Sequence, residues 1–520
     1  MSLNPRKRGC LDKMKVVKEQ TIKTKDKKME STLLIDGVIV GILAGFVGVV
    51  YRILIDYSGK TTDFFVRKTE ESYLYIFGLI ILLTVLGLMS SRIISKDKYV
   101  GGSGIPQVAA EVTGRIKTNP IRILILKLTG GTVSALGGLS LGREGPSIQL
   151  GAMSGKLVAR LFKRTKIREN YLMTSGASAG LSVAFHAPLA GVLFSMEEIH
   201  KNVSKKLIIS CFSAAVVADI ISQLIFGFKP VFSFPEIERV SISTYPYIVL
   251  LGIVLGLFGT VYNKVMKGMF DLYKKFNVSV KIRPFVAYAA SGIMFFVYPQ
   301  VLGSGHNLVE MLLYSKYTIY GLAILFFLKM GFSLVSFTSG VPGGIFLPIL
   351  VQGAILGCLF GTVLGGNNLG LYVIISMSGY LTAVVRNPLT SVVLIFEMTR
   401  SLNGFLPLAV TCLVSYFTAN LLGTKPVYEY LLDRVLDKED DSKEQAVEVE
   451  IVTVVEAGSP VVGKKIRELK WLEGSIIVQI DRGGKLMLPR GDTTIRQNDK
   501  LTLHLPPANA DEIISSIEKM

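Results

Sequence analysis

The sequence predicts an all-α polytopic membrane protein built of two related halves with broken helices, followed by a small α+β domain. Three observations support this prediction. Of the 520 residues, 50% are hydrophobic and 18% are charged, whereas soluble domains carry about 25% charged residues. Long apolar segments recur between residues 33 and 423, and a glycine-rich motif near residue 142 returns 202 residues later. From about residue 447 the pattern changes to short alternating segments typical of strands.

The chain begins with a basic segment, residues 1–32. Its first thirty residues contain ten lysines and arginines and four acids, and an apolar run follows directly. Positive charge beside a first membrane helix favours a cytoplasmic location for that flank. We therefore expect a solvated, disordered cytoplasmic tail here. This basic segment accounts for part of the net charge of +18. The positive charge therefore does not require a nucleic-acid partner.

The predicted membrane domain spans residues 33–432, with halves at roughly 33–230 and 245–432. A membrane-spanning helix needs about 20 apolar residues, and several apolar runs here are shorter or are interrupted by Gly, Pro or a charge. This pattern predicts tilted helices and helices broken within the bilayer. The apolar runs are 33–54, 74–90, 206–228, 246–267, 285–302, 318–337, 349–365, 371–396 and 404–423.

An internal repeat relates the two halves. LGREGPSIQLGAMSG aligns with PGGIFLPILVQGAILG, and GGSGI (101–105) resembles LGSGH (302–306). Paired broken helices at corresponding positions indicate the binding site of a transporter. Five residue pairs lie 202 positions apart: Lys127/Lys329, Gly142/Gly344, Pro146/Pro348, Gly151/Gly353 and Gly155/Gly357.

Three glycine-rich breaks each precede an apolar helix, at 102–106, 142–146 and 343–348. Glycine allows the backbone to approach a ligand closely, and helix N-termini present free N–H groups and a positive dipole end. Several such ends converging at membrane depth would bind an anion without a full positive charge. The alternative is that the glycines only permit close helix packing; three breaks in repeat register favour the anion site.

These motifs resemble those of the CLC family of chloride channels and chloride/proton antiporters. The resemblance covers roughly residues 33–435 and rests on GSGIP, GREGP, GGIFLP, AFHAPLAGVLFSMEEIH and KPVYE. It implies two inverted halves in each subunit, a pore in each subunit and a homodimer. It also implies a multi-pass protein of the cell membrane with both termini in the cytoplasm.

The resemblance implies a role for each of four chloride-binding residues. Ser103 matches the pore serine whose hydroxyl contacts the central ion, and serine there resembles chloride-preferring members. Ile345 and Phe346 match residues whose backbone amides contact the same ion. Tyr428 matches the tyrosine whose phenol donates to it. Without the resemblance, Ser103 would be interpreted as a helix cap, Phe346 as a core aromatic and Tyr428 as an interfacial anchor.

Two acids are expected to handle protons. Glu144 lies beside the predicted anion site, and an acid within the membrane is functional by default; it matches the family's gating glutamate. Glu198 matches the internal proton-transfer glutamate of family antiporters, where channel members commonly have valine. Glu197 is a weaker candidate, because its repeat mate Glu397 suggests a shared structural role at a helix end. His186 and His200 are expected to be hydrogen-bonded helix-end residues.

An acidic linker (433–446) leads to a domain at 447–520 that resembles the TrkA C-terminal domain. Strands are expected at VEVEIVTVV, SIIVQID, KLMLP and KLTLHLP, and helices at KKIRELK and ADEIISSIEKM. Such domains usually dimerise, and some bind cyclic di-AMP. Arg482 and Arg490 are candidates to contact its phosphates, and Ile477, Val478 and Pro489 its adenine. The alternative is that both arginines are solvated turn residues and the domain only aids dimerisation.

The leading hypothesis is therefore a chloride/proton antiporter with a ligand-regulated tail, which has chloride and protons as substrates and no cofactor. A passive, voltage-gated-type chloride channel of the same fold is the alternative, and Glu198 argues against it. A potassium pore is excluded because no TVGYG-like filter occurs. A fluoride-specific member is disfavoured by Ser103 and GREGP. No Walker motif, GxGxxG loop or CxxC pair occurs, so the sequence favours neither an enzyme, a membrane-tethered nucleic-acid- or nucleotide-binding protein, nor a metal site.

Overall fold

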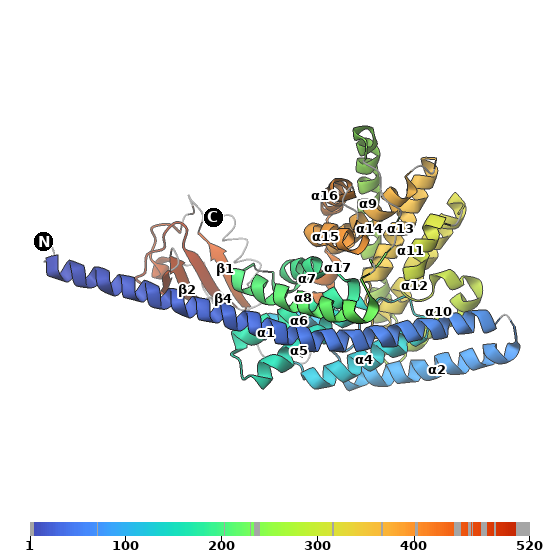
Figure 1. The fold of residues 1–520 in the computed structure, drawn as a ribbon, viewed down its shortest axis with the longest axis horizontal. Helices are drawn as coiled ribbons and strands as arrows, with labels where there is room; N and C mark the ends of the chain where they lie inside the picture. Colours follow the sequence, from blue (N-terminus) through green and yellow to red (C-terminus); the bar gives the residue numbers. More distant parts are fainter. Residues whose placement is uncertain are drawn as a thin grey trace. The chain divides into compact units, whose positions relative to one another are not determined.

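The computed structural model describes residues 5–505 except 70, 202, 229, 233, 235–239, 315–316, 366–367, 401–403, 441–448, 456–458, 460, 470–475 and 483–484. The chain forms two units, Met1–Leu436 and Asp437–Met520. The first unit is helical and the second contains an antiparallel sheet (Figure 1). The predicted helix at 510–520 lies outside the described residues.

The helical unit repeats one order of elements twice. The first half comprises α1 (Pro5–Lys68), α2 (Tyr73–Lys96), α3 (Ile105–Val112), α4 (Pro120–Leu136), α5 (Glu144–Leu161), α6 (Lys166–Phe185), α7 (Pro188–Phe194) with a π-helical turn (Ser195–His200), and α8 (Lys205–Phe226). The second comprises α9 (Tyr245–Lys275), α10 (Arg283–Val297), α11 (His306–Tyr314), α12 (Ile319–Thr338), α13 (Phe346–Val363), α14 (Leu369–Val385), α15 (Pro388–Thr399) and α16 (Phe405–Leu421). Short 3₁₀ turns precede α9 (Ile242–Thr244) and α11 (Pro299–Val301), and α17 (Val427–Asp440) follows the second half.

Three predicted boundaries differ from the structure. Helix α1 begins at Pro5, so the structure has helix where the sequence predicts a disordered tail. The apolar run 371–396 is not one helix. It is divided at Arg386 and Asn387, because Arg386 adopts a positive φ of 71° and Pro388 starts the next helix. Helix α17 also extends through the first part of the predicted linker.

Six helical segments among the described residues are long and apolar enough to cross a membrane. They are Ser31–Lys68, Tyr73–Lys96, Lys205–Phe226, Ile242–Lys275, Ile319–Thr338 and Phe346–Val363. The outer faces of α2, α8 and α16 expose large apolar side chains such as Phe77, Phe212 and Phe417. An apolar outer face suits contact with lipid or with another membrane-embedded surface.

Glycines bring corresponding helix pairs together in both halves. A β-carbon on Gly151 of α5 would collide with the carbonyl oxygen of Gly176 in α6. Its repeat mate Gly353 of α13 meets Ser376 of α14 in the same way, with a β-carbon 2.6 Å from the carbonyl oxygen. Close approach through small residues is how membrane helices gain packing energy without a hydrophobic driving force. The repeat seen in the sequence therefore corresponds to a repeated helix–helix contact.

The repeated lysines Lys127 and Lys329 have matching structural roles. Lys127 Nζ donates to the carbonyl oxygens of Val100 and Gly102, at 2.9 and 2.6 Å. Lys329 Nζ donates to the carbonyl oxygens of Val301 and Gly303, both at 2.8 Å. Both side chains are fully buried. Each lysine thus fixes the backbone of the glycine-rich break in its own half, where no helical hydrogen bonds are available.

The second unit contains a four-stranded antiparallel sheet in the order β1-β4-β2-β3. The strands are β1 (Val449–Val454), β2 (Ile476–Arg482), β3 (Lys485–Met487) and β4 (Lys500–Leu505). All four fall in the predicted segments, except that β2 ends one residue later, at Arg482. The helix predicted at KKIRELK is wrong. Only a 3₁₀ turn, Ile466–Glu468, forms there, because the amides of Ile466 and Arg467 donate to Thr493 and Gly491 of the facing loop.

Candidate functional site

Backbone hydrogen bonds join the three glycine-rich breaks of the helical unit. Gly142 and Gly344 exchange both possible bonds, at 2.7 and 2.8 Å between nitrogen and oxygen. The Gly102 amide donates to the Val341 carbonyl, and the Gly343 amide donates to the Gly102 carbonyl, both at 3.1 Å. Helices α3, α5 and α13 therefore begin at one place, although their first residues lie up to 241 positions apart.

These three helix N-termini have no side-chain cap among the described residues. Elsewhere in the same unit, α2, α4, α8 and α12 are capped by Ser72, Asn119, Ser204 and Thr318. Uncapped first-turn amides remain available to an anion, and the helix dipole favours negative charge at that end. Helices such as α6, α9 and α16 also begin without a side-chain cap, so the convergence of the three ends, and not the missing caps alone, distinguishes this place.

Polar side chains without partners gather at the same place. Ser103 Oγ, both carboxyl oxygens of Glu144 and the Tyr428 hydroxyl are buried and have no hydrogen-bond partner among the described residues. Buried polar groups are almost always hydrogen-bonded, so several unsatisfied groups together call for an explanation. A small anion fits two of these groups, because the serine and tyrosine hydroxyls are donors. The predicted residues Ser103, Glu144 and Tyr428 thus share this environment.

The surrounding geometry positions each of these groups. Ser103 lies against the first turn of α5, since a β-carbon on Gly145 would be 2.8 Å from the Ser103 carbonyl oxygen. A β-carbon on Gly142 would collide with Glu144 Oε2, so glycine leaves the space that this carboxylate occupies. The Tyr428 phenol is within interaction range of the Ser103 hydroxyl and the Glu144 carboxyl.

Aromatic rings form the apolar side of the site. Phe346 is the first residue of α13, and Ile345 is its N-cap, so their amides belong to the uncapped end as predicted. The Phe346 ring packs against Phe185 and Phe194, with centroids 5.7 and 6.0 Å away, and Phe194 lies 6.3 Å from the Tyr428 ring. These contacts pack the Tyr428 ring against the apolar side of the site.

Glu198 lies in the π-helical turn after α7 and is 7% exposed. Its Oε2 accepts a hydrogen bond of 2.9 Å from Asn387 Nδ2. Asn387 is the N-cap residue of α15, at the break between α14 and α15. Sequence reasoning missed it, although one signal was available: its repeat mate, Ala187, is apolar at the equivalent break.

Glu197 and Glu397 confirm the structural role suggested by their repeat spacing. Glu397 accepts hydrogen bonds from the amides of Leu189 and Ala190 at the start of α7, at 3.1 and 2.8 Å. Glu197 accepts from the amide and hydroxyl of Thr390 at the start of α15, at 3.0 and 2.5 Å. Each acid therefore caps a helix of the other half.

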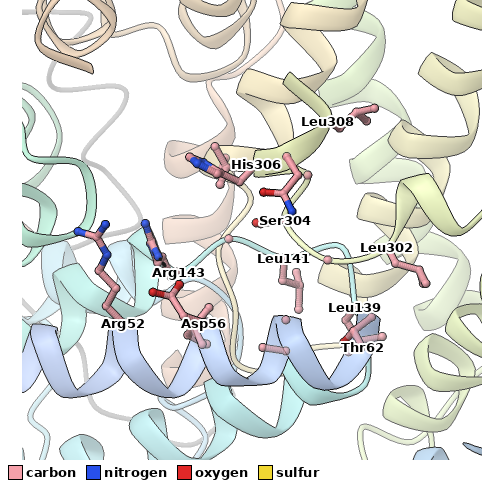
Figure 2. A pocket seen from close by; sticks show the side chains of 18 of the residues that line it. Arg52, Asp56, Thr62, Leu139, Leu141, Arg143, Leu302, Ser304, His306 and Leu308 are labelled. Carbon is pink, nitrogen blue, oxygen red and sulfur yellow. Dashed lines mark hydrogen bonds and ion pairs between the residues drawn. The ribbon is translucent and has the colours of Figure 1, made fainter. Parts of the chain in front are cut away.

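A cavity of about 670 Å³ opens beside Glu144 and is lined by Gly142, Arg143 and Leu347. Figure 2 shows Arg52, Asp56 and Arg143 on one side of it and His306 on another. Arg143 Nη1 pairs with Asp56 Oδ1 at 3.1 Å. The cavity thus reaches the residues that flank the gating glutamate predicted from the sequence.

The two predicted helix-end histidines are hydrogen-bonded. His186 Nε2 accepts from Arg52 Nη1 at 2.7 Å, and Nδ1 lies 2.9 Å from Asp219 Oδ1. An arginine can only donate, so the Nδ1 proton belongs to the bond with Asp219. His200 Nδ1 lies 3.2 Å from Thr174 Oγ1.

In the second unit, the candidate ligand residues have different environments. The Arg482 guanidinium donates to both carboxyl oxygens of buried Asp499 and to the Thr494 carbonyl, each at 2.7 Å. Burial would raise the pKa of the Asp499 carboxyl, but its bonds to Arg482 and to the Arg496 amide outweigh burial and keep the pKa below its usual range. Ile477 lies in the core of the unit. Val478 and Pro489 are partly exposed, and Arg490 is exposed.

Comparison with known proteins agrees with the site. Residues 86–420 match the family model described as voltage gated chloride channel. The chain belongs to the CLC family. Residues 449–517 match the TrkA-C domain. The H(+)/Cl(-) exchange transporter ClcA of Citrobacter koseri is 30% identical over 429 residues, which are 79% of this chain and 90% of that protein.

Solved structures of CLC proteins show the same fold. A slow cyanobacterial Cl⁻/H⁺ antiporter superposes with a TM-score of 0.74 at 29% identity, covering 78% of this chain and 99% of that one. A CLC-type fluoride/proton antiporter gives a TM-score of 0.64 at 20% identity, covering 76% and 97%, and supports the fold alone. The similar proteins are transporters, which confirms that this CLC chain is a multi-pass membrane protein and not an enzyme.

Proposed function

We propose that this protein exchanges chloride for protons across the cell membrane. The observation that supports this most strongly is the environment of Glu144. Its carboxylate is fully buried and without a partner at the meeting point of three uncapped helix ends. Chloride would bind there to the hydroxyls of Ser103 and Tyr428 and to the amides of Ile345 and Phe346.

Glu144 would alternate between two states. As a carboxylate it competes with chloride for the helix ends, since both are anions. When protonated, Glu144 carries no negative charge to interact with the helix ends. Its side chain then turns away, and chloride can enter. A ligand or proton shifts such an equilibrium only as far as it prefers one state. The competition therefore links movement of each chloride to protonation of Glu144.

Glu198 would act as the internal proton-transfer residue and supply protons to Glu144. It is buried and receives one hydrogen bond from Asn387, and an ionisable residue within a membrane domain is expected to be functional. The passive channel needs no such residue. The exchange transporters that resemble this chain at 29–30% identity support the same proposal.

We expect reconstituted protein to move protons uphill when a chloride gradient is imposed. Liposomes are loaded with chloride, the voltage is clamped with potassium and valinomycin, and external pH is recorded. Proton movement that follows the chloride gradient and reverses with it supports exchange. Chloride flux without proton movement would leave the passive channel as the function.

We further propose that the protein is a homodimer with cytoplasmic termini and a pore in each subunit. The apolar outer faces of α8 and α16, with Phe212 and Phe417, offer a surface for a second copy. A dimer would contain two copies of the second unit and so present the same contacts twice, which suits a symmetric ligand. Cyclic di-AMP is such a ligand, and its binding would change the linker and bias transport.

The tail proposal predicts binding of cyclic di-AMP to the detergent-solubilised full chain at micromolar concentration or tighter, measured by calorimetry. Arg490→Ala should weaken binding, because the exposed guanidinium is free to contact a phosphate. Arg482→Ala is less diagnostic, since it also removes the ion pair with Asp499. Absence of heat and of a thermal shift would reject this ligand. Binding without any change in liposome chloride flux would reject regulation alone.

A further inference from the structure

Tyr51 of α1 is a buried residue that has no role in the proposed binding of chloride or transfer of protons. Its side chain is 1% exposed, and it lines the cavity together with Gly131, Gly142 and Leu347. The hydroxyl makes no hydrogen bond among the described residues. A buried phenol normally finds a partner for its hydroxyl group. The Tyr51 residue lines the cavity instead, so its hydroxyl can be reached by a side chain that turns into this space.

The position of the hydroxyl is well defined. A β-carbon on Gly131 of α4 would collide with Tyr51 Oη, so the absence of a side chain at 131 makes room for this group. The phenol lies within electrostatic interaction range of the Glu144 carboxyl and the Arg143 guanidinium. Both carboxyl oxygens of Glu144 are also without partners. A donor and an acceptor, each unsatisfied, therefore flank the same end of the cavity.

We propose that Tyr51 is the hydrogen-bond partner of the Glu144 carboxyl when this side chain turns from the helix ends toward the cavity. The inference rests on the proposed function, since it assigns a partner to the open position of the gate. The phenol can donate to the carbonyl oxygen of the protonated acid or accept its proton in a hydrogen bond. Tyr51 is thus a positioning residue that stabilises the state in which chloride passes and protons exchange.

The other charged groups of the cavity are already engaged or belong to different elements. Arg143 pairs with Asp56, and Arg52 donates to His186. His306, at the start of α11, stacks on Phe232 with ring centroids 4.7 Å apart. Lys60 and Asp63 line the cavity from α1, nine and twelve residues after Tyr51, which is roughly two and a half to three turns further along the helix. None of these makes a hydrogen bond to Glu144 among the described residues. Tyr428 also lies near the carboxyl, but Tyr51 is the phenol that lines the cavity, so it is the donor on the cavity side of Glu144.

Tyr51→Phe tests the proposal in full-length protein reconstituted in liposomes. The substitution removes one oxygen atom and no hydrogen bond of the folded protein, so thermal stability should not fall. Loss of one hydrogen bond to the open gate should slow coupled turnover about fivefold, since such a bond contributes about 1 kcal/mol. Tyr288→Phe is the matched control: it removes a buried hydroxyl bonded to Ser90, outside the cavity, and should keep the wild-type rate.

A double-mutant cycle separates positioning from a general structural effect. In a Glu144→Ala background no carboxyl remains, so the effect of Tyr51→Phe on chloride flux should disappear. Unchanged turnover in the single variant, or equal slowing in both backgrounds, would overturn the role of Tyr51 while leaving the gate intact. Normal proton transport by Glu144→Ala itself would overturn the gate and this inference together.

Discussion

Replacing Glu144 by glutamine or alanine should abolish proton transport and leave chloride transport in place. Neither side chain can carry the proton, and neither presents a negative charge to the uncapped helix ends. Chloride would then reach those ends without competition. In liposomes with a chloride gradient, the expected result is chloride efflux with no change in external pH beyond that of protein-free vesicles.

Arg143 provides a useful comparison for Glu144 because it is the preceding residue and lines the same cavity. Arg143→Gln removes the ion pair with Asp56 but retains the acid, so coupling should persist even if the rate changes. Proton transport at the normal ratio by either Glu144 variant would show that another group carries the proton.

Glu198→Gln should have the second large effect. Glutamine fills the same volume and still offers an oxygen to Asn387, but it cannot exchange a proton. Proton flux should fall by roughly two orders of magnitude, the lower range for loss of a positioned acid–base group, while chloride flux continues. Parallel recording of chloride and pH in the same vesicles gives the ratio directly.

Glu197→Gln is the matched control for Glu198. The two residues are adjacent, but Glu197 caps α15 through Thr390, and glutamine retains an acceptor for this amide. The expected result is a modest loss of thermal stability with normal coupling. Equal loss of proton flux in both variants would indicate that the π-helical turn, and not the Glu198 carboxyl, had been disturbed.

The sequence predicted the broken-helix architecture because glycine and proline mark those breaks directly. The spacing of 202 residues identified Lys127 and Lys329 as equivalent, and both prove to bind the carbonyl groups of corresponding breaks. Their function could not be predicted from spacing alone, because the carbonyl partners lie 25 to 28 positions away. The sequence therefore identified residues that belong to a recognisable motif or repeat. It could not predict roles that depend on partners distant in the chain.

Asn387 and Tyr51 illustrate what the sequence could not reveal. Asn387 meets Glu198 across 189 positions, and Tyr51 meets the Gly131 region through a helix packing that no local pattern encodes. The helix predicted at KKIRELK failed for a similar reason: its amides bond to a loop more than twenty residues away. In each case the role or conformation of the residues depends on a tertiary contact and not on the local sequence pattern.

Glu197 and Glu397 each cap a helix in the other half of the chain, and this affects when each half can complete its folding during synthesis. The start of α7 obtains its acceptors from a residue 207 to 208 positions later. At about 5 to 20 residues per second, the ribosome needs roughly 10 to 40 s to reach that residue. During this interval the amides of Leu189 and Ala190 lack their native acceptor. The first half cannot reach its final form ahead of the second, so maturation of both must wait for the late part of translation.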